Sequence, residues 1–270
     1  MKLFFGEFEA DYAKYHFPYQ VWLVREEGDP VEKIYTNGFL PMRNKKGVYY
    51  LSRNIRVNLN LFELSSENRR ILKKTENFES DIIPLSEFKY TPQIQKMCLD
   101  YSKKKFGEKV FSSQSVKNIF QGDVYNYVFV FKEISSGEMV GFAVCFVSNE
   151  MVQYAHSFYN PSLIDENLGA RMMLESVVWS KKSDKKFIYL GTCYERNALY
   201  KTEFKGVEFF NGFRWNDDLN ELKDLIKKGQ EGQEEPEGPE YLLKDKDFLN
   251  NYYQGDLNTV LSNYGVRVIF

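Results

Sequence analysis

Residues 151–191 decide the fold, and they read MVQYAHSFYN PSLIDENLGA RMMLESVVWS KKSDKKFIYL G. The first stretch, Met151–Tyr159, is rich in aromatic and β-branched residues, which favours a strand that ends at Asn160-Pro161-Ser162. Leu168–Lys182 then carries apolar residues at helical spacing. Phe187–Leu190 is a short apolar run before Gly191. A strand, a helix and a strand of these lengths predict a βαβ unit with parallel strands and a right-handed crossover.

The flanking sequence extends this unit on both sides. Upstream, Tyr125–Phe131 and Met139–Val147 predict two strands joined by the turn Ser135-Ser136-Gly137-Glu138. Downstream, Asn197–Phe204 predicts a short helix and Gly206–Phe210 a final strand. A hairpin, a βαβ crossover, a short helix and a last strand resemble the order of the GCN5-related acyltransferase fold. We therefore expect an α/β (α+β) protein with a mixed sheet and flanking helices.

The N-terminal part is predicted to be a smaller, β-rich lobe. Val21–Val24, Gly47–Leu51 and Ile55–Leu61 are short β-prone runs. Ser65 has the character of a helix N-cap, and Thr91–Phe106 predicts an amphipathic helix that begins after Pro92. We expect a lobe over 1–80, an acyltransferase-like domain over 81–215, a charged linker over 216–240 and a packed segment of unassigned role over 241–270.

Composition excludes several classes of protein. Hydrophobic residues make up 43% of the chain, yet no run reaches the about 18 apolar residues of a membrane-spanning helix. Met1–Glu9 has no long apolar stretch, so a secretory signal is not expected. Cys98, Cys145 and Cys193 are far apart, and the chain has two histidines. We expect Cys145 to be a buried free thiol and the chain to be cytoplasmic, with no cofactor and no metal cluster.

Basic residues cluster although the net charge is −2. Nine lie between positions 43 and 74, and four more are Lys181, Lys182, Lys185 and Lys186. The segment 231–240 carries five glutamates, which offset this charge in the sum but not on the surface. Either basic cluster alone is typical of a solvated face. Together with the acidic segment they leave an anionic partner and ordinary solvation about equally favoured.

Short motifs in a fixed order resemble those of the arginyl- and leucyl-tRNA–protein transferases. In the second half they are Phe158-Tyr159-Asn160-Pro161, Leu168-Gly169, Tyr189-Leu190-Gly191, Leu199–Lys205 and Gly212-Phe213-Arg214-Trp215. In the first half they are Asn37-Gly38-Phe39, Tyr49-Tyr50, Arg56-Val57, Phe62 and Ser65–Arg70. The resemblance covers roughly residues 35–75 and 128–215. Single motifs are weak, but the ordered set is fairly specific.

Two departures from the family pattern stand out. The family carries a cysteine cluster before the position of Arg56, whereas this chain has Leu51-Ser52-Arg53-Asn54. Control that depends on such a cluster should therefore be absent. The acid of the family's F-Y-D-P turn is Asn160 here, so a role for that carboxylate does not carry over.

The resemblance implies transfer of an amino acid, arginine or leucine, from an aminoacyl-tRNA to the N-terminal α-amine of an acceptor protein or peptide. The α-amine has a pKa of about 7.7–8, and the ester is already activated. Holding the two ends together can therefore supply most of the rate, because oriented reactants gain about 7–11 kcal/mol. No catalytic triad is required.

The expected cleft lies where the strands part, near the end of Phe187–Leu190. We expect Tyr189 and Gly191 on one side and Tyr159 on the other, with backbone N–H groups near Gly191 stabilising the oxyanion. The candidate catalytic residues are Tyr189 and two possible general bases, His156 and Glu203. Candidate substrate-binding residues are Arg69, Arg70, Tyr159, Asn160, Leu168, Gly169, Gly191, Lys201 and Phe204. For Tyr189 a core position, and for Lys201 a solvated helix surface, are the structural alternatives.

The tRNA is expected to be held through its phosphates and not by base reading. The candidate tRNA-binding residues are Arg43, Lys45, Lys46, Arg53, Arg56, Lys73 and Lys74. Two other functions stay open. A CoA-dependent N-acyltransferase is disfavoured by the acids in Asp165–Arg171, where a pyrophosphate would bind. A catalytically silent homologue that binds tRNA or protein N-termini is the second.

Overall fold

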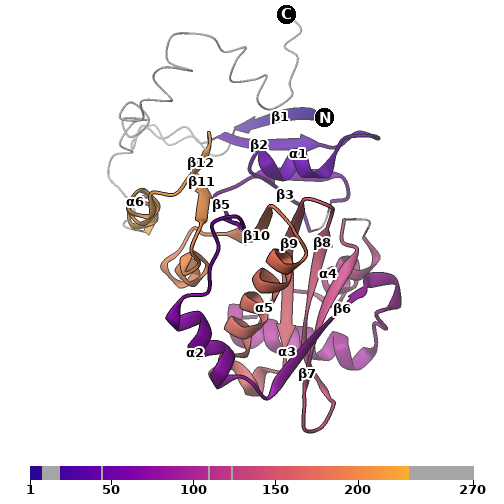
Figure 1. Ribbon diagram of the computed structural model, residues 1–270. Coiled ribbons are helices and arrows are strands. Elements are labelled where there is room, and N and C mark those ends of the chain that lie inside the picture. Colours follow the sequence, from indigo (N-terminus) through magenta and orange to yellow (C-terminus); the bar gives the residue numbers. More distant parts are fainter. Residues whose placement is uncertain (8–18, 44, 109, 123, 231–270) are drawn as a thin grey trace, which may run out of the picture.

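The computed structural model describes residues 1–7, 19–43, 45–108, 110–122 and 124–230. Two sheets form the framework (Figure 1). The larger has eight strands in the order β12-β11-β5-β10-β9-β8-β7-β6, and the smaller has four in the order β1-β2-β4-β3. In spatial order the strands of the large sheet are β12 (Trp215–Asn216), β11 (Val207–Phe210), β5 (Asn54–Asn58), β10 (Phe187–Thr192), β9 (Met151–Tyr159), β8 (Met139–Val147), β7 (Tyr127–Glu133) and β6 (Phe78–Pro84).

The centre of the large sheet is the expected hairpin and βαβ unit. Strands β7, β8 and β9 are antiparallel neighbours, and β10 pairs with β9 in parallel. The helix between them, α5 (Leu168–Lys182), has the bounds that the sequence predicts. Several of its apolar residues are fully buried, among them Leu168, Met172 and Val177. The expected mixed sheet with flanking helices is therefore confirmed.

Strands β9 and β10 pair only over a short length and then part. The paired residues are Met151–Gln153 on β9 and Phe187–Tyr189 on β10. Just beyond them each strand carries a bulge, because Ala155 is an extra residue against β8 and Leu190 an extra residue against β5. A bulge bends its strand and increases its twist. Two bulges at the same level thus open the sheet between its central parallel strands.

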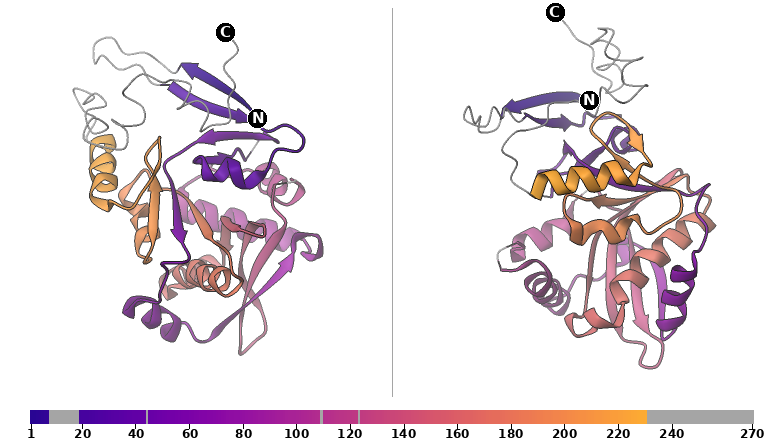
Figure 2. Two further views of the ribbon diagram at one scale, coloured as in Figure 1. Left: turned by 45° about the horizontal axis from the view of Figure 1, so that its top comes forward. Right: turned by 90° about the vertical axis from the view of Figure 1, so that its left-hand side faces the viewer.

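Helices cover both faces of this sheet. Helix α5 and helix α2 (Ser66–Lys74) lie on one face, and α3 (Pro92–Phe106) and α4 (Ser113–Gln121) on the other, as the right-hand view of Figure 2 shows. The ends of the helices follow local rules. Ser65 and Ser112 each form a capping box, and Thr91 caps α3 ahead of Pro92. The described residues also include the 3-10 segments η1 (Leu85–Glu87), η2 (Pro161–Glu166) and η3 (Arg196–Thr202).

The described part of the N-terminal lobe contains the small sheet and helix α1. Its elements are β1 (Lys2–Glu7), β2 (Tyr19–Val24), α1 (Val31–Thr36), β3 (Phe39–Pro41) and β4 (Val48–Leu51). The lobe packs on the beginnings of β9 and β10 through buried aromatic rings. The Tyr35 and Tyr189 rings lie 5.4 Å apart, the Tyr35 hydroxyl bonds to Gln153, and Trp215 Nε1 donates to the Thr36 carbonyl at 2.7 Å.

The structure divides the chain differently from the sequence-based prediction. Strands β5 and β6 come from the first 84 residues but belong to the large sheet, because their apolar side chains complete its core. Much of the expected linker over 216–240 is helix α6 (Leu219–Gln230). Leu222 and Ile226, four residues apart, are buried on one side of it. The expected helix over Asn197–Phe204 is the 3-10 segment η3. The predicted packed segment over 241–270 lies outside the described residues.

The three cysteines are buried free thiols, as predicted for Cys145. Among the described residues no group of three or more His, Cys, Asp or Glu side chains is placed to hold a metal ion. None of the helices in the described ranges is long and apolar enough to cross a bilayer.

Candidate functional site

A pocket of about 180 Å³ opens where β9 and β10 part. Side chains from both faces of the sheet line it, because the parting of the strands exposes the gap to α3 and to α5. The lining residues are Tyr101, Lys105, Phe106, Phe111, Tyr154, Ala155, His156, Ser157, Phe158, Met173, Leu190, Tyr200 and Lys201. The bulged residues Ala155 and Leu190 are among them. The same irregularity that opens the sheet therefore shapes the pocket.

Two lysines from different elements reach this pocket. Lys105 lies one turn after Tyr101 on α3, and its Nζ donates to the Tyr101 hydroxyl at 2.7 Å. Lys201 lies on η3, and its Nζ donates to the Thr192 carbonyl at 2.8 Å. The backbone of Gly191 passes close by, since a Cβ built there would lie 3.7 Å from Lys201 Nζ. Gly191 has φ +82°, a conformation that favours glycine.

The pocket is cationic, and its lysines are partly desolvated. Burial lowers the pKa of Lys201 to about 8, with the nearby Cys193 opposing the shift and Lys105 adding to it. Burial also lowers the pKa of Lys105. No carboxylate is among the described residues that line the pocket. A lysine with a pKa near 8 can exchange a proton at physiological pH.

His156 stands in the pocket wall but is a weak base. Burial, with a smaller contribution from the charge of Arg43, lowers the pKa of His156 to about 3. Its Nε2 lies 3.1 Å from the Tyr125 hydroxyl. The ring is therefore neutral at pH 7 and a poor proton acceptor from an amine. The geometry does not favour the predicted general base at His156. Glu203, the other candidate, is exposed just after η3 and is absent from the pocket lining.

Tyr189 lies on the opposite side of its strand from the pocket. Its side chain is 1% exposed and packs between Tyr35 and Trp215, at the contact with the N-terminal lobe. The expectation that Tyr189 lines the cleft is therefore wrong, and the core position is the one observed. Its neighbour Leu190 faces the pocket instead. Ordinary alternation along the strand accounts for this, because Ile188 and Leu190 belong to the main core and Tyr189 between them faces the other side.

Tyr159 borders the pocket without lining it. Its ring lies 4.6 Å from that of Tyr101, and its hydroxyl occupies the space beside Gly169, where a Cβ would approach it to 2.8 Å. Three other predicted substrate-binding residues have local structural contacts. Asn160 caps η2 by accepting from the Ser162 backbone N–H at 3.0 Å. Leu168, the first residue of α5, is fully buried, and Phe204 packs in the core.

The predicted arginine pair on α2 is remote from the pocket lining. Arg70 is exposed and paired with Glu67 on its own helix, and Arg69 donates to the Leu64 carbonyl at 2.6 Å. Of the predicted set for this cleft, the structure brings together Lys201, Gly191 and His156, with Tyr159 at the border. It does not bring Arg69, Arg70 or Tyr189 to it.

Most of the predicted tRNA-binding residues are on the surface, with one exception. Arg43, Lys45, Lys46, Lys73 and Lys74 are exposed, and Arg53 is half-buried with its guanidinium 5.2 Å from the Tyr194 ring. Arg56 is only 8% exposed. It is paired with Glu208 at 2.6 Å and lies 4.0 Å from each of the Phe187 and Trp215 rings. A phosphate cannot reach Arg56, so that prediction is wrong.

Several pocket residues were not singled out in the sequence. Tyr101 and Lys105 come from α3, Tyr154 from β9 and Tyr200 from η3. Tyr200 stands beside Lys201 in a motif that the sequence does display. Tyr101 and Lys105 are ordinary features of an amphipathic helix with a basic last turn. No local sequence pattern distinguishes these two residues, because their contacts with β9 and η3 are between residues far apart in the chain.

The segment before α5 does not have the chemistry of a pyrophosphate loop. It forms η2, which contains the acids Asp165 and Glu166, and Asn167 enters α5 at φ 61° without a side-chain cap. Two carboxylates beside a helix N-terminus disfavour a bound pyrophosphate. This counts against the CoA-dependent alternative.

Residues 88–211 match the family model described as the C terminus of arginine-tRNA-protein transferase. An aspartate/glutamate leucyltransferase of Xylella fastidiosa strain M23 is 25% identical over 81 residues, which are 29% of this chain and 32% of that protein. A protein of the same name from Ruegeria pomeroyi is 28% identical over 79 residues, 28% of this chain and 29% of that protein. The chain thus spans about a third of the length of the curated relatives it matches.

A solved structure of the C-terminal domain of a putative lysylphosphatidylglycerol synthetase from Agrobacterium fabrum has a TM-score of 0.40 and 14% identity. The alignment covers 53% of this chain and 47% of that chain. Every residue of the lined pocket falls within the matched range 88–211. The ordered motifs of the sequence and this match agree, because both liken residues 88–211 to the C terminus of the arginine-tRNA-protein transferases.

Proposed function

We propose that this protein transfers an amino acid from an aminoacyl-tRNA to the N-terminal α-amine of an acceptor protein or peptide. One observation carries the proposal. The cationic pocket at the opening between β9 and β10 is built wholly from residues of the family-matched domain. The proposal includes a cytoplasmic location, because charged tRNA is found there.

In the proposed reaction the acceptor nitrogen attacks the ester carbonyl carbon of the aminoacyl group. A C–N bond forms, the C–O bond to the terminal ribose breaks, and the product is an amide and a free ribose hydroxyl. The nitrogen must lose a proton, and the ribose oxygen must gain one. We assign this proton movement to Lys201, whose pKa of about 8 is close to that of an α-amine. Its bond to the Thr192 carbonyl orients Nζ in the pocket.

The size and walls of the pocket suit a small apolar donor. At about 180 Å³ it is smaller than the about 300–1,000 Å³ of sites for drug-sized ligands, so it suits one amino-acid group and not a whole nucleotide. Phe106, Phe158 and Met173 give it apolar walls. An arginine side chain would meet Lys105 and Lys201 with no carboxylate among the described lining residues. We therefore infer leucine as the donor in preference to arginine.

The tRNA body is proposed to lie on the exposed basic residues. Arg43, Lys45 and Lys46 lie on the β3–β4 connection, and Lys73 and Lys74 at the end of α2. Contacts of this kind are with phosphates, so binding should weaken steeply as salt rises.

The proposal is tested by incubating the full chain with leucyl- or arginyl-tRNA and peptides that begin with Asp, Glu or other residues. Mass spectrometry should detect addition of one leucine to a peptide. A Lys201→Met variant should lose addition, while Lys205→Met should keep it, because Lys205 is an exposed surface residue paired with Glu63. If no combination of charged tRNA and peptide shows addition of an amino acid, the proposal is refuted. Stabilisation by acetyl-CoA in a thermal shift would instead favour the CoA-dependent alternative.

A further inference from the structure

A second pocket, of about 440 Å³, lies in the N-terminal lobe where the lobe meets the chain that leaves β10. It is larger than the donor pocket, the one proposed above where β9 and β10 part. Its lining residues are Gln20, Val21, Trp22, Met42, Tyr50, Leu51 and Tyr194, and none of these described residues is charged. Apart from Tyr194 they lie outside the range 88–211, so the family match gives this lobe pocket no role.

Three aromatic rings form walls of the lobe pocket. Trp22 and Tyr50 are directly opposite each other on β2 and β4, so their side chains lie on one face of the small sheet. The Tyr194 hydroxyl accepts from the Arg53 backbone N–H at 3.0 Å, and the Arg53 guanidinium lies 5.2 Å from the centre of the Tyr194 ring. Trp22 and Tyr50 are half-buried and Tyr194 is 48% exposed, so part of each side chain is open to solvent. Rings of this kind suit a flat, uncharged ligand that stacks on them.

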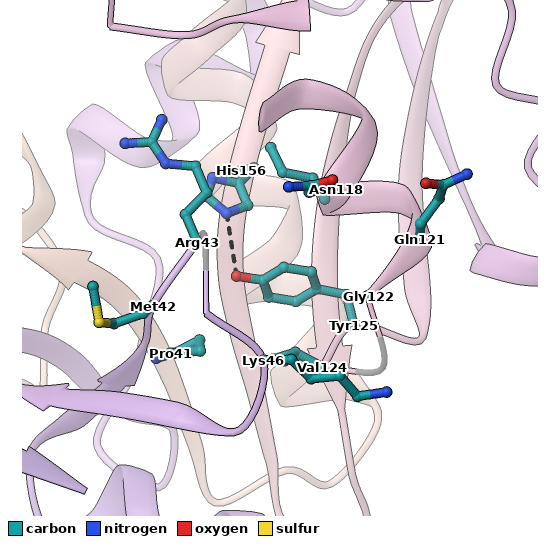
Figure 3. A pocket seen from close by; sticks show the side chains of 11 residues that line it. Pro41, Met42, Arg43, Lys46, Asn118, Gln121, Gly122, Val124, Tyr125 and His156 are labelled. Atoms are coloured by element: carbon teal, nitrogen blue, oxygen red, sulfur yellow. Dashed lines mark hydrogen bonds between the residues drawn. The ribbon is translucent and has the colours of Figure 1, made fainter. Parts of the chain in front are cut away.

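Positive charge borders the lobe pocket on the side of the β3–β4 connection. Met42 lines the lobe pocket, and with Arg43 and Lys46 it also lines a neighbouring pocket of about 220 Å³. Figure 3 shows these three side chains on the N-terminal-lobe wall of the neighbouring pocket. Burial raises the pKa of Tyr50, with Tyr194 adding to the shift and Arg43 opposing it, so the charge of Arg43 acts on the aromatic wall. The rings therefore adjoin residues that are proposed to hold the tRNA.

We infer that the lobe pocket binds an unpaired base of the tRNA 3′ end, which stacks on Trp22, Tyr50 and Tyr194. The inference rests on the proposed function. Proteins bind single-stranded nucleic acid by combining aromatic rings, on which bases stack, with a cationic surface that follows the phosphates. The pocket volume lies within the about 300–1,000 Å³ of small-molecule sites, which suits one base with its ribose. A base inside a duplex has no free face to stack, so the site distinguishes the unpaired end from the paired stem.

The connection between β10 and η3 joins the lobe pocket to the donor pocket. Tyr194 is on this connection, and Tyr200 and Lys201 of η3 line the donor pocket further along the same segment. The ester that carries the donor amino acid is at the end of the unpaired strand, so bases of that strand must lie next to the donor pocket. Binding energy from a base held in the lobe pocket would then position the ester for attack.

An apolar side chain of the acceptor peptide is the rival ligand, because the same rings could hold it. The cationic border favours RNA. Every nucleotide brings a phosphate beside its base, and Arg43 and Lys46 adjoin the rings at a place where such phosphates would lie. An apolar side chain in a peptide brings no fixed charge to this border.

The test compares two RNA hairpins that carry no amino acid, one with an unpaired 3′ CCA end and one with a blunt end. Fluorescence anisotropy follows their titration with the full chain. Trp22→Leu and Tyr194→Leu should each weaken binding of the hairpin with the unpaired end about 5- to 150-fold, the range of one lost base–aromatic stack. Binding of the blunt hairpin should not change. Phe5→Leu is the matched control, because Phe5 is a 58% exposed ring of the same lobe that does not line the pocket.

Salt dependence separates the stacking residues from the phosphate contacts. The slope of log affinity against log salt should be the same in Trp22→Leu as in wild type, because no phosphate contact is lost. Arg43→Met should instead weaken both hairpins and reduce the slope by about one.

The outcomes distinguish the lobe pocket from the reaction. The inference is overturned if both ring variants bind the two hairpins as wild type does, or if they weaken both hairpins equally. Wild-type RNA binding together with a raised KM for acceptor peptides would assign the pocket to the acceptor. Selective loss of binding to the unpaired end, in a protein that transfers no amino acid, would refute the proposed reaction and leave the base site standing.

Discussion

Replacing Lys201 tests whether this residue moves a proton or only supplies charge. Its pKa of about 8 means that about one tenth of the side chain is neutral at pH 7, about half at pH 8 and about nine tenths at pH 9. If the neutral amine is the base, the transfer rate at saturating substrates should rise about fivefold from pH 7 to 8. From pH 8 to 9 it should rise less than about twofold.

Two variants separate the roles. Lys201→Met removes both charge and base, and should lower the rate about 100-fold or more, as expected for loss of a general base. Lys201→Arg keeps the positive charge but cannot lose its proton in this pH range, so it should be impaired to a similar degree. A role in binding an anion would instead leave Lys201→Arg nearly active.

The assay is single-turnover transfer of leucine from a preformed complex, followed by mass spectrometry between pH 6 and 10. The acceptor α-amine also titrates near pH 8. The pH dependence that remains in Lys201→Arg therefore gives the contribution of the α-amine to the wild-type pH profile. A variant that keeps its rate within about twofold of wild type, with an unchanged pH profile, would refute the assignment of proton transfer to Lys201.

Three further predictions concern stability. Arg56→Met should lower the free energy of unfolding by about 3 kcal/mol, measured by urea denaturation, because it leaves the Glu208 carboxylate without its partner; the salt dependence of tRNA binding should not change. Gly38→Ala should cost more than Gly28→Ala in the same assay: both have positive φ, worth about 1–2 kcal/mol, but only at Gly38 would a Cβ fall 2.3 Å from an aromatic ring. At His156 the folded-state pKa of about 3 lies below the ordinary 6.5, so the unfolded chain takes up a proton first as pH falls. From pH 7 to 4 wild type should therefore lose up to about 3 kcal/mol more stability than His156→Gln, and equal losses would contradict the buried neutral ring.

Local signals explain which elements could be predicted. The strand Met151–Tyr159 and the helices Leu168–Lys182 and Pro92–Phe106 lie at or within a residue of their expected bounds. Each is delimited by its own sequence, through a proline, a cap or a run of apolar residues at one spacing. The order of these elements along the chain was enough to predict the parallel pair and the helix between them.

The order of the elements along the chain was not enough to predict the roles of the residues at the site. A strand read as strictly alternating places Tyr189 and Leu190 on opposite faces, but it does not say which of them faces the cleft. The packing of Tyr189 on Tyr35 settles that point. Arg56 belongs to a run rich in basic residues, yet its half-buried partner Glu208 is 152 positions away. The charge pattern alone could not reveal that pair.

By itself the sequence determined the strand–helix–strand centre, the family motifs and the absence of close cysteine pairs, because each depends on residues that lie within a few tens of positions of one another. The tertiary structure alone decided that Tyr101, Lys105, His156 and Lys201 share one pocket, that Tyr189 packs against the N-terminal lobe, and that Arg56 is buried in the large sheet beside Glu208 and Trp215. The reason is physical: hydrophobic spacing and capping act between neighbours in the chain, whereas a pocket forms where strands part and bring distant side chains together.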